Sequence, residues 1–165
     1  MNRVYLLLGS NLANPLRQIS SALEKVASIT KSYIVSTSFV YETPPYGPEN
    51  QPNFFNVAVA LDTCLDPQSL LSSTQCIEIE QGRIRQEPRW GARTLDIDMM
   101  LFGNITLKTP QLTIPHYDLH NRAFMMIPLL EIAPSICLPN GQRLSVILGT
   151  LDHEIINNIR KSHCI

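Results

Sequence analysis

Hydrophobic residues along the N-terminal part of the chain follow two spacings, one typical of strands and one typical of helices. Apolar runs at 4–8 and 54–61, and a β-branched and aromatic stretch at 33–41, predict three strands. Over 14–27 and 66–81 the apolar residues instead recur every three or four positions, which predicts two amphipathic helices. The predicted order in this part of the chain is therefore strand, helix, strand, strand and helix.

Both predicted helices begin with the same pair of residue types. Asn14-Pro15 and Asp66-Pro67 each place a capping side chain directly before a proline at the first helical position. The capping side chain can accept hydrogen bonds from the free N–H groups of the first turn. Gly82 lies where the second helix is expected to end.

A further apolar run at 95–102 contains two aspartates and predicts a fourth strand. Because side chains alternate between the faces of a strand, Asp96 and Asp98 point the same way. The pattern fits a central strand whose first residues open into a cleft. The two faces are predicted to hold Asp96, Asp98, Met100 and Phe102 on one side, and Leu95, Ile97, Met99 and Leu101 on the other.

The predicted order of strand, helix, strand, strand, helix and strand is the split βαβ pattern of ferredoxin-like folds. We therefore expect an α+β domain with a ferredoxin-like βαββαβ core, in which two helices cover one face of an antiparallel sheet. C-terminal additions would cover the other face and complete an αβα sandwich. They are predicted to be a short edge strand at 105–107, a helix over 121–132 broken near Pro128, and closing helices at 144–148 and 155–159.

Composition limits the class of protein. With 165 residues, 44% hydrophobic and 16% charged, the chain is expected to form a single domain over 1–165 with a substantial core. The net charge of −1 provides no general attraction to nucleic acid or acidic membranes. The N-terminal apolar run is too short for a signal peptide, and no segment approaches the ~20 apolar residues of a membrane span. Four scattered cysteines lack zinc or thioredoxin-like spacing, so we expect a cytoplasmic protein with reduced thiols.

The two aspartates follow a segment rich in arginine. Four of the 13 Lys and Arg residues lie at 83, 85, 89 and 93, together with the only tryptophan, Trp90. Buried carboxylates need a charged partner or a metal, and Asp96 and Asp98, roughly 7 Å apart at Cα, can bridge a pair of divalent ions. Oxygen ligands favour Mg²⁺, and guanidinium groups suit phosphate. The aspartate pair and the arginine-rich segment are each common on ordinary protein surfaces, but together they favour a nucleoside triphosphate site.

Other segments have two interpretations each. The stretch 43–53, with four prolines and a glycine, is a tolerated surface loop or, as we favour, a binding loop or lid. Asn56 is the one polar residue of its strand, and its amide needs either backbone partners or the edge of a heterocyclic ligand. The 9–11 segment lacks the glycine pattern and lysine of a P-loop, so we interpret it as a turn. His116 lies in a segment that is expected to be extended, and His120 follows it. For both we favour a phosphate contact or a surface position over a zinc site.

Four motifs resemble those of the 6-hydroxymethyl-7,8-dihydropterin pyrophosphokinases of folate biosynthesis. They are GSNLANP at 9–15, YETPPYGPENQPNFFN at 41–56, RWGARTLDIDMMLFG at 89–103 and IPHYDLHNRAFMMIPLLEIAP at 114–134. The likeness covers almost the whole chain, and the third motif with the fourth at this distance is highly specific. It implies transfer of the β,γ-pyrophosphoryl group of ATP to the hydroxymethyl oxygen of the pterin, with AMP as the other product.

The resemblance also implies roles for individual residues. Asp96 and Asp98 would hold two Mg²⁺ ions, Arg83 and Arg93 would hold phosphates, and these four would form the catalytic set. The pterin-binding residues would be Thr43, Pro44, Pro45, Tyr46, Phe54, Asn56, Trp90 and Phe124. The ATP-binding residues would be Gln75, Glu78, Arg83, Arg85, Trp90, Arg93, Leu112, Thr113, His116, Tyr117 and Arg122. From helical position alone, Gln75 and Glu78 would be ordinary surface residues.

The sequence departs from the family at a few positions. Phe54 stands where tyrosine is frequent, and Gln86 and Gln111 stand where basic residues are often found, so a hydroxyl contact and extra ATP contacts are not expected there. The implied partners are two small molecules, ATP and the pterin. We expect a monomer without an obligate protein partner that binds neither nucleic acid nor membrane.

Two rival functions remain open from the sequence. A nucleic-acid-binding ferredoxin-like module would need a particular aromatic pattern on an open sheet and a broad basic surface. An ordinary γ-phosphoryl kinase would use the same metal chemistry and release ADP.

Overall fold

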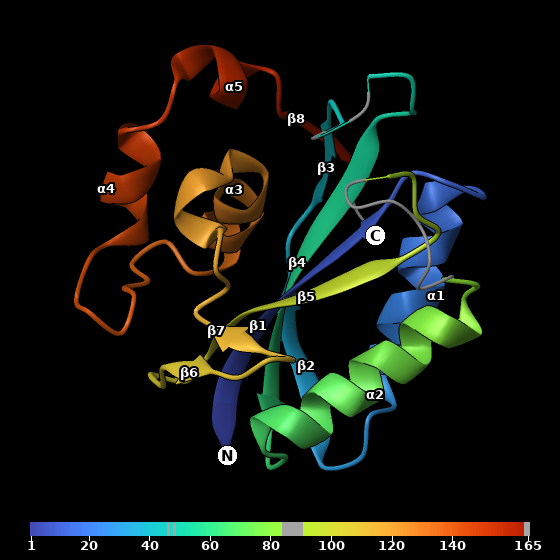
Figure 1. Ribbon diagram of the computed structural model, residues 1–165, viewed down its shortest axis with the longest axis vertical. Coiled ribbons are helices and arrows are strands. Elements are labelled where there is room, and N and C mark those ends of the chain that lie inside the picture. The colour runs from blue at the N-terminus through green and yellow to red at the C-terminus, as the bar shows by residue number, and fades with distance from the viewer. Residues whose placement is uncertain (46, 48, 84–90, 164–165) are drawn as a thin grey trace.

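An antiparallel sheet with helices on both faces organises the chain (Figure 1). The computed structural model describes residues 1–45, 47, 49–83 and 91–163. The main sheet contains β1 (Asn2–Ser10), β2 (Ser32–Thr37), β3 (Val40–Thr43), β4 (Phe54–Thr63), β5 (Asp96–Phe102) and β8 (Arg160–His163). The helices are α1 (Pro15–Ala27), α2 (Pro67–Glu80), α3 (Ala123–Ile132), α4 (Leu144–Gly149) and α5 (His153–Asn157), with a 3-10 turn at Leu119–Asn121.

The sheet brings together strands that are far apart in the sequence. Its order is β5-β1-β4-β3-β8, with β2 also paired to β4, and every pairing is antiparallel. The first strand therefore lies between β4 and β5. This central position explains why β1 is apolar on both faces, with Leu6, Leu7 and Leu8 all buried.

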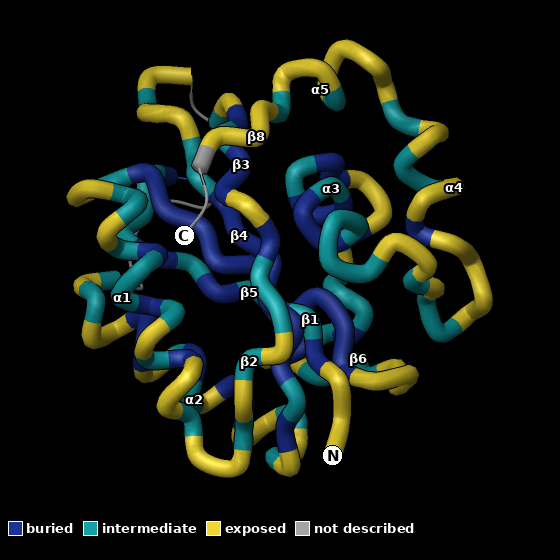
Figure 2. Tube along the Cα trace, turned by 180° about the vertical axis from the view of Figure 1, so that it is seen from behind, coloured by how far each residue is buried: buried dark blue, intermediate teal, exposed yellow. Residues whose placement is uncertain are grey.

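Each face of the sheet supports its own hydrophobic core. On one face, β1 contributes Leu6 and Leu8 to a cluster with α1 and α2. On the other face, Leu7 packs with Met125 and Met126 of α3 and with α4. Figures 1 and 2 show the two helical layers on opposite sides of the sheet. The expectation that the C-terminal part covers the second face is confirmed, as is the α+β class with an antiparallel sheet.

The helix starts are also confirmed. Asn14 Oδ1 accepts a hydrogen bond from the Arg17 N–H at 3.4 Å, and Asp66 Oδ1 accepts one from the Ser69 N–H at 3.0 Å. The prolines that follow occupy the first turns of α1 and α2, where a missing N–H costs nothing.

The alternation predicted for β5 is wrong at its end. The pairing of β1 with β5 shifts register between Tyr5 and Leu6, which oppose Leu101 and Met99, so Met100 is an extra residue in a β-bulge. Beyond a bulge the faces exchange. Leu101 therefore joins the α3 core and Phe102 joins the α1–α2 core, the reverse of the prediction. The positions of Asp96 and Asp98 precede the bulge and are unaffected.

Several predicted boundaries near the middle of the chain also need correction. The predicted strand 33–41 is two strands, because the Ser38 hydroxyl and N–H both bond to the backbone of Ala58 and interrupt the ladder. Gly9 and Ser10 belong to β1 instead of a turn. The predicted edge strand at 105–107 is instead β6 (Leu107–Lys108), which pairs with β7 (Thr113–Ile114) in a separate two-stranded sheet.

The C-terminal region differs from prediction in two elements. Pro128 does not break α3, because it is buried within the helix and the packing around it holds the turns on either side. The predicted helix 155–159 ends at Asn157, and Arg160–His163 then form β8 against β3. Among the described residues, no helix is long and apolar enough to cross a membrane.

Candidate active site

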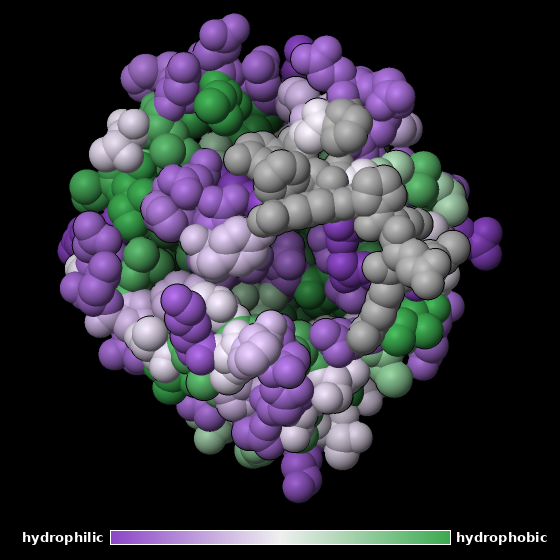
Figure 3. Space-filling view, viewed as in Figure 1, coloured by the Kyte–Doolittle hydropathy of each residue, from purple (hydrophilic) through white to green (hydrophobic). Residues whose placement is uncertain are grey.

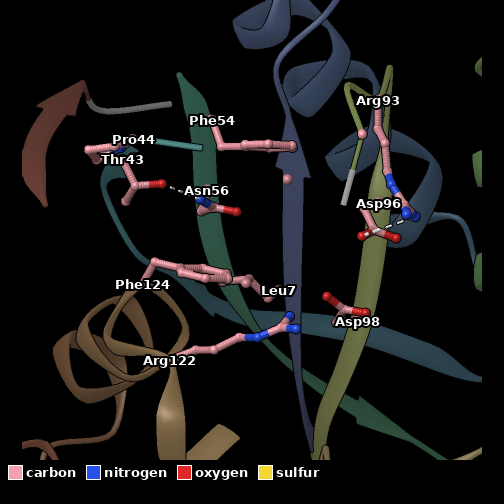
Figure 4. A pocket seen from close by; sticks show the side chains of 12 residues that line it. Leu7, Thr43, Pro44, Phe54, Asn56, Arg93, Asp96, Asp98, Arg122 and Phe124 are labelled. Atoms are coloured by element: carbon pink, nitrogen blue, oxygen red, sulfur yellow. Dashed lines mark hydrogen bonds and ion pairs between the residues drawn. The ribbon is translucent and has the colours of Figure 1, made fainter. Parts of the chain in front are cut away.

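A cleft opens on the α3 side of the sheet, where β1 lies between β4 and β5 (Figure 4). The surface is hollowed near the centre of the face seen in Figure 3. Residues of four strands and of α3 line the cleft, together with Pro44 after β3, Arg122 before α3, and Gly91 and Arg93 before β5. They are Leu7, Gly9, Thr43, Pro44, Phe54, Asn56, Gly91, Arg93, Asp96, Asp98, Arg122 and Phe124.

The register of the sheet determines which side chains share the floor of this cleft. Gly9 of β1 pairs with Asn56 of β4 on one side and with Asp96 of β5 on the other. Two residues earlier, Leu7 pairs with Asp98. Residues two apart point the same way, so the strand pairing places an amide and two carboxylates on one face, as predicted for the carboxylates.

Two aromatic rings face each other across one half of the cleft. Phe54 projects from β4 and Phe124 from the first turn of α3, and Asn56 lies between them at the back (Figure 4). The Asn56 amide is buried and donates to the Thr43 hydroxyl at 3.4 Å. The two rings and the amide suit a flat heterocycle with hydrogen-bonding groups on its edge.

The other half of the cleft is charged. Arg83 forms ion pairs with Glu78 and with Asp96, the latter at 2.8 Å, and Arg93 lies 3.7 Å from the second oxygen of Asp96. Glu78 is buried and accepts a hydrogen bond from the Ile97 N–H at 2.7 Å. Glu78 is therefore not the surface residue that its helical position suggests, because α2 packs this side against β5.

The clustered carboxylates change one another's ionisation. Burial raises the pKa of the Asp98 carboxyl, and the charges of Asp96 and Glu78 raise it further. Burial and the charge of Asp96 likewise raise the pKa of Glu78, although Arg83 opposes this. Burial disfavours the charge on Arg83, but the carboxylates of Asp96 and Glu78 outweigh it and raise its pKa. The site thus concentrates negative charge, which Arg83, Arg122 and the Ile97 N–H partly offset.

A second pocket lies on the other side of Asp98. It is lined by Leu71, Ile97, Asp98, Met99, Thr109, Pro110, Gln111, Leu112, Thr113, His116 and Tyr117. His116 Nε2 lies 3.7 Å from Asp98 Oδ1, and the His116 and Tyr117 rings stack at 4.6 Å. Burial and the charge of Arg122 lower the pKa of His116 to about 4, so this histidine is neutral near pH 7. His120 is exposed and does not share this environment.

The oxygen donors of this site suit Mg²⁺ better than a metal ion whose ligands all come from the protein. Within the described ranges, no group of three or more His, Cys, Asp and Glu side chains could hold a metal ion. Asp96 and Asp98 supply two hard oxygen donors at the charged end of the cleft, and a cation there would relieve their repulsion. Mg²⁺ commonly binds through one or two carboxylates and completes its shell with water and substrate phosphates.

The comparisons with known proteins show the family of the chain. The sequence model of the family described as 7,8-dihydro-6-hydroxymethylpterin-pyrophosphokinase (HPPK) matches residues 5–134. The chain belongs to the HPPK family. Both faces of its sheet are covered by helices, so the open sheet that the rival nucleic-acid-binding module requires is absent from the described residues.

Proteins similar to this HPPK chain include two curated bacterial relatives, each named 2-amino-4-hydroxy-6-hydroxymethyldihydropteridine pyrophosphokinase. The protein from Haemophilus influenzae is 43% identical over 94% of this chain and 98% of its own. The protein from Pseudomonas aeruginosa is 45% identical over 96% of this chain and 98% of its own.

Solved structures show the same fold at lower identity. The crystal structure of Plasmodium falciparum HPPK-DHPS wild type with SDX-DHP superposes with a TM-score of 0.72 at 17% identity over 98% of this chain. This chain spans only 47% of that longer one.

Most of the site residues predicted for an HPPK lie along one of the two pockets. Four of those that the structure describes are not among the linings of these two pockets: Pro45, Gln75, Glu78 and Arg83, of which Arg83 forms ion pairs with Glu78 and with the lining residue Asp96. Tyr46, Arg85 and Trp90 lie outside the described residues, so their predicted roles stay predictions.

One residue that sequence reasoning missed joins the two loops beside the cleft. Asn11, predicted only as part of a turn, is buried; its amide donates to Gln51 Oε1 at 3.0 Å and to the Pro52 carbonyl at 2.9 Å. Its side-chain oxygen accepts from the Arg93 N–H at 2.7 Å. Asn11 thus ties Gln51 and Pro52 of the proline-rich loop, and Arg93 ahead of β5, to the end of β1. The feature that reveals this role is a buried asparagine whose side-chain polar groups all have hydrogen-bond partners. Burial of a single asparagine cannot be predicted from the sequence.

Proposed function

We propose that the protein transfers pyrophosphate from ATP to the hydroxymethyl group of 6-hydroxymethyl-7,8-dihydropterin. The products are AMP and the pterin diphosphate, in a step of tetrahydrofolate biosynthesis. The observation that carries this proposal is the position of Asp98, which lines both pockets. Two substrates bound on either side of Asp98 would meet at the carboxylates, where phosphoryl chemistry needs its charge compensation.

The first pocket supplies the features of a pterin site. Phe54 and Phe124 offer two stacking faces, and Asn56 offers both a donor and an acceptor to the ring edge. Thr43 and Pro44 line the same cleft and Pro45 follows them, while Tyr46 and Trp90 complete our proposed pterin set. The guanidinium carbon of Arg122 lies 5.7 Å from the centre of the Phe124 ring and 5.8 Å from that of the Tyr117 ring, so Arg122 would lie between the two substrates.

The second pocket supplies the features of a nucleotide site. Leu112, Thr113 and Tyr117 line it with both apolar and polar surface, and neutral His116 adds a donor near Asp98. We propose that they hold ATP together with Gln75, Glu78, Arg83, Arg85, Trp90, Arg93 and Arg122. Arg83 and Arg93 already point at Asp96 and would turn to phosphate oxygens when the triphosphate binds.

In the proposed reaction, the hydroxymethyl oxygen forms a bond to the β-phosphorus as the bond from that phosphorus to the α,β-bridging oxygen breaks. AMP leaves with the bridging oxygen, and the proton of the hydroxymethyl group is released. Asp96 and Asp98 would hold Mg²⁺, in our proposal two ions, which supplies charge neutralisation and alignment of the attacking and leaving oxygens. Arg83 and Arg93 would stabilise charge that develops on the transferred group. Trp90 and the proline-rich loop would exclude water, which competes as a nucleophile.

Finer features are proposals as well. The strand order, with β1 between β4 and β5, supports a ferredoxin-like core within a single domain over 1–165. We also propose a monomer that acts in the cytoplasm on its two small-molecule substrates without an obligate protein partner.

Product analysis tests the proposed function directly. Incubation with ATP, Mg²⁺ and the reduced hydroxymethylpterin is expected to yield AMP and the pterin diphosphate in equal amounts, measured by anion-exchange chromatography. Omission of either the pterin or Mg²⁺ should abolish AMP formation. ADP as the nucleotide product would instead support a γ-phosphoryl kinase.

Phe124→Ala is expected to weaken pterin binding by roughly tenfold to a hundredfold, because one stacking face of the sandwich is lost. Binding of a non-hydrolysable ATP analogue should change little. Isothermal titration calorimetry with each ligand measures both. Phe39→Ala is a matched control, since Phe39 is partly exposed beside Lys161 and lies outside both linings. Pterin affinity equal to that of the wild type would exclude the stacking pair.

A further inference from the structure

Gly9 lies in the floor of the cleft, between the amide and the carboxylates. It is buried, lines the cleft, and pairs with Asn56 on β4 and Asp96 on β5. The proposed pterin site and the proposed metal site therefore meet across this one residue. A side chain on Gly9 would extend from the sheet toward Asn56.

The backbone at this position does not require glycine. Gly82, Gly103 and Gly141 have φ between 52° and 89°, which side chains rarely adopt, but Gly9 is not among the glycines with positive φ. Any need for glycine at position 9 must therefore come from space around it.

Within the part of the chain that the structure describes, one neighbouring group limits the space. A Cβ atom built on Gly9 would lie 2.6 Å from Asn56 Oδ1 and 3.7 Å from Asn56 Cγ, whereas the nearest backbone atom, the Phe55 carbonyl oxygen, is 3.9 Å away. A methyl group would thus force only the Asn56 amide to move. The hydrogen bond from that amide to the Thr43 hydroxyl holds it in its present place.

We infer that Gly9 is a positioning residue for the pterin: its missing side chain allows the Asn56 amide to lie flat at the back of the cleft. This inference rests on the proposed function and deepens it. A methyl group at position 9 would turn the amide away from Thr43 or into the space between Phe54 and Phe124, where the ring would stack. The pterin would then lose hydrogen bonds to its edge and room between the rings.

Gly9→Ala is expected to lower the affinity for the reduced pterin about tenfold or more, the effect of at least one lost hydrogen bond. The KM for the pterin should rise to a similar extent, while kcat at saturating pterin and the affinity for a non-hydrolysable ATP analogue should stay within about twofold. Calorimetry and steady-state kinetics measure these quantities. Gly149→Ala is the matched control, because among the described residues, apart from its chain neighbours and the backbone of its own helix, no atom lies within 4 Å of a Cβ built there.

A double-mutant cycle with Asn56→Ala tests whether Gly9 acts through the amide. In the Asn56→Ala background, Gly9→Ala should cause no further loss of pterin affinity, since the clash is gone. In the ligand-free protein, Gly9→Ala should also shift the side-chain NH₂ resonances of Asn56 in ¹⁵N-resolved NMR spectra.

The outcomes separate this inference from the proposed function. If wild-type protein binds the pterin and Gly9→Ala binds it equally well, or if the two substitutions cause additive losses, the positioning role is wrong while the proposed function stands. If the wild type fails to bind the pterin, both are wrong. If Gly9→Ala and the double variant both lose binding of the ATP analogue, Gly9 serves folding alone and the inference is overturned.

Discussion

Asp98→Asn is expected to lower turnover by on the order of 10³-fold or more while the fold survives. The substitution keeps the shape of the side chain but removes the charge that would bind Mg²⁺ between the two pockets. Pyrophosphoryl transfer, measured as AMP release, should therefore be lost at saturating ATP and pterin. An active Asp98→Asn enzyme would exclude the proposed metal site.

The same substitution is expected to leave the thermal midpoint of unfolding unchanged or raised. The charged form of Asp98 is disfavoured in the folded protein, because burial and the neighbouring Asp96 and Glu78 raise the pKa of its carboxyl. A neutral amide avoids that repulsion. Added Mg²⁺ with the ATP analogue should raise the midpoint of the wild type more than that of the variant, as differential scanning fluorimetry would show.

Asp62→Asn is a suitable control for Asp98→Asn. Asp62 also lies on a strand of the same sheet and forms an ion pair with Arg3, but it lies at the opposite end of β4 from Phe54 and Asn56 of the cleft. The control should retain full turnover. A comparable loss of activity in both variants would indicate a general effect on the sheet.

Arg83→Ala is expected to lower kcat roughly 100-fold with a much smaller change in ATP affinity. Arg83 already has partners in the ligand-free protein, namely Glu78 and Asp96, so ground-state binding of ATP exchanges one set of ion pairs for another. Its contact with phosphate should strengthen only as charge develops on the transferred group. Single-turnover kinetics together with calorimetric ATP-analogue binding separates the two quantities.

Arg83→Ala is also expected to lower the stability of the folded protein. Without Arg83, the buried Glu78 loses its cation, and we expect a loss of roughly 1–3 kcal/mol in the free energy of unfolding. The double variant Arg83→Ala/Glu78→Gln should recover stability but not turnover. Arg83→Lys keeps the charge without the two-pronged geometry, and its turnover should lie between those of the wild type and Arg83→Ala. Weakened ATP binding with unchanged kcat would contradict the catalytic role.

Local spacing explains why so much of the fold could be predicted from the sequence. A side chain in a strand shares its face with the residue two positions on, and a capping residue acts within one turn, so Asp96, Asp98, Asn14 and Asp66 could be placed without knowing any distant neighbour. The second hydrophobic core could be anticipated because β1 is apolar on both faces. An uncovered apolar face would be unstable in water.

The errors share a cause in contacts between distant parts of the chain. The bulge at Met100 depends on how β5 is paired with β1, and it exchanged the faces of the last two residues of β5. Pro128 continues a helix because a core holds it there. Glu78 has the helical position of a surface residue, yet the packing of α2 turns it toward Ile97 and Arg83.

The sequence by itself determined most of the helices and strands, the shared face of the two aspartates and, through its motifs, the family. Only the tertiary structure decided that Gly9 lies beside Asn56, that Asn11 joins two loops, and that Asp98 separates two pockets. The physical reason is the distance along the chain over which each kind of interaction acts. Hydrophobic periodicity and capping act between near neighbours in the chain, whereas a site is formed by the register and packing of segments whose separation in sequence carries no information about their distance in space.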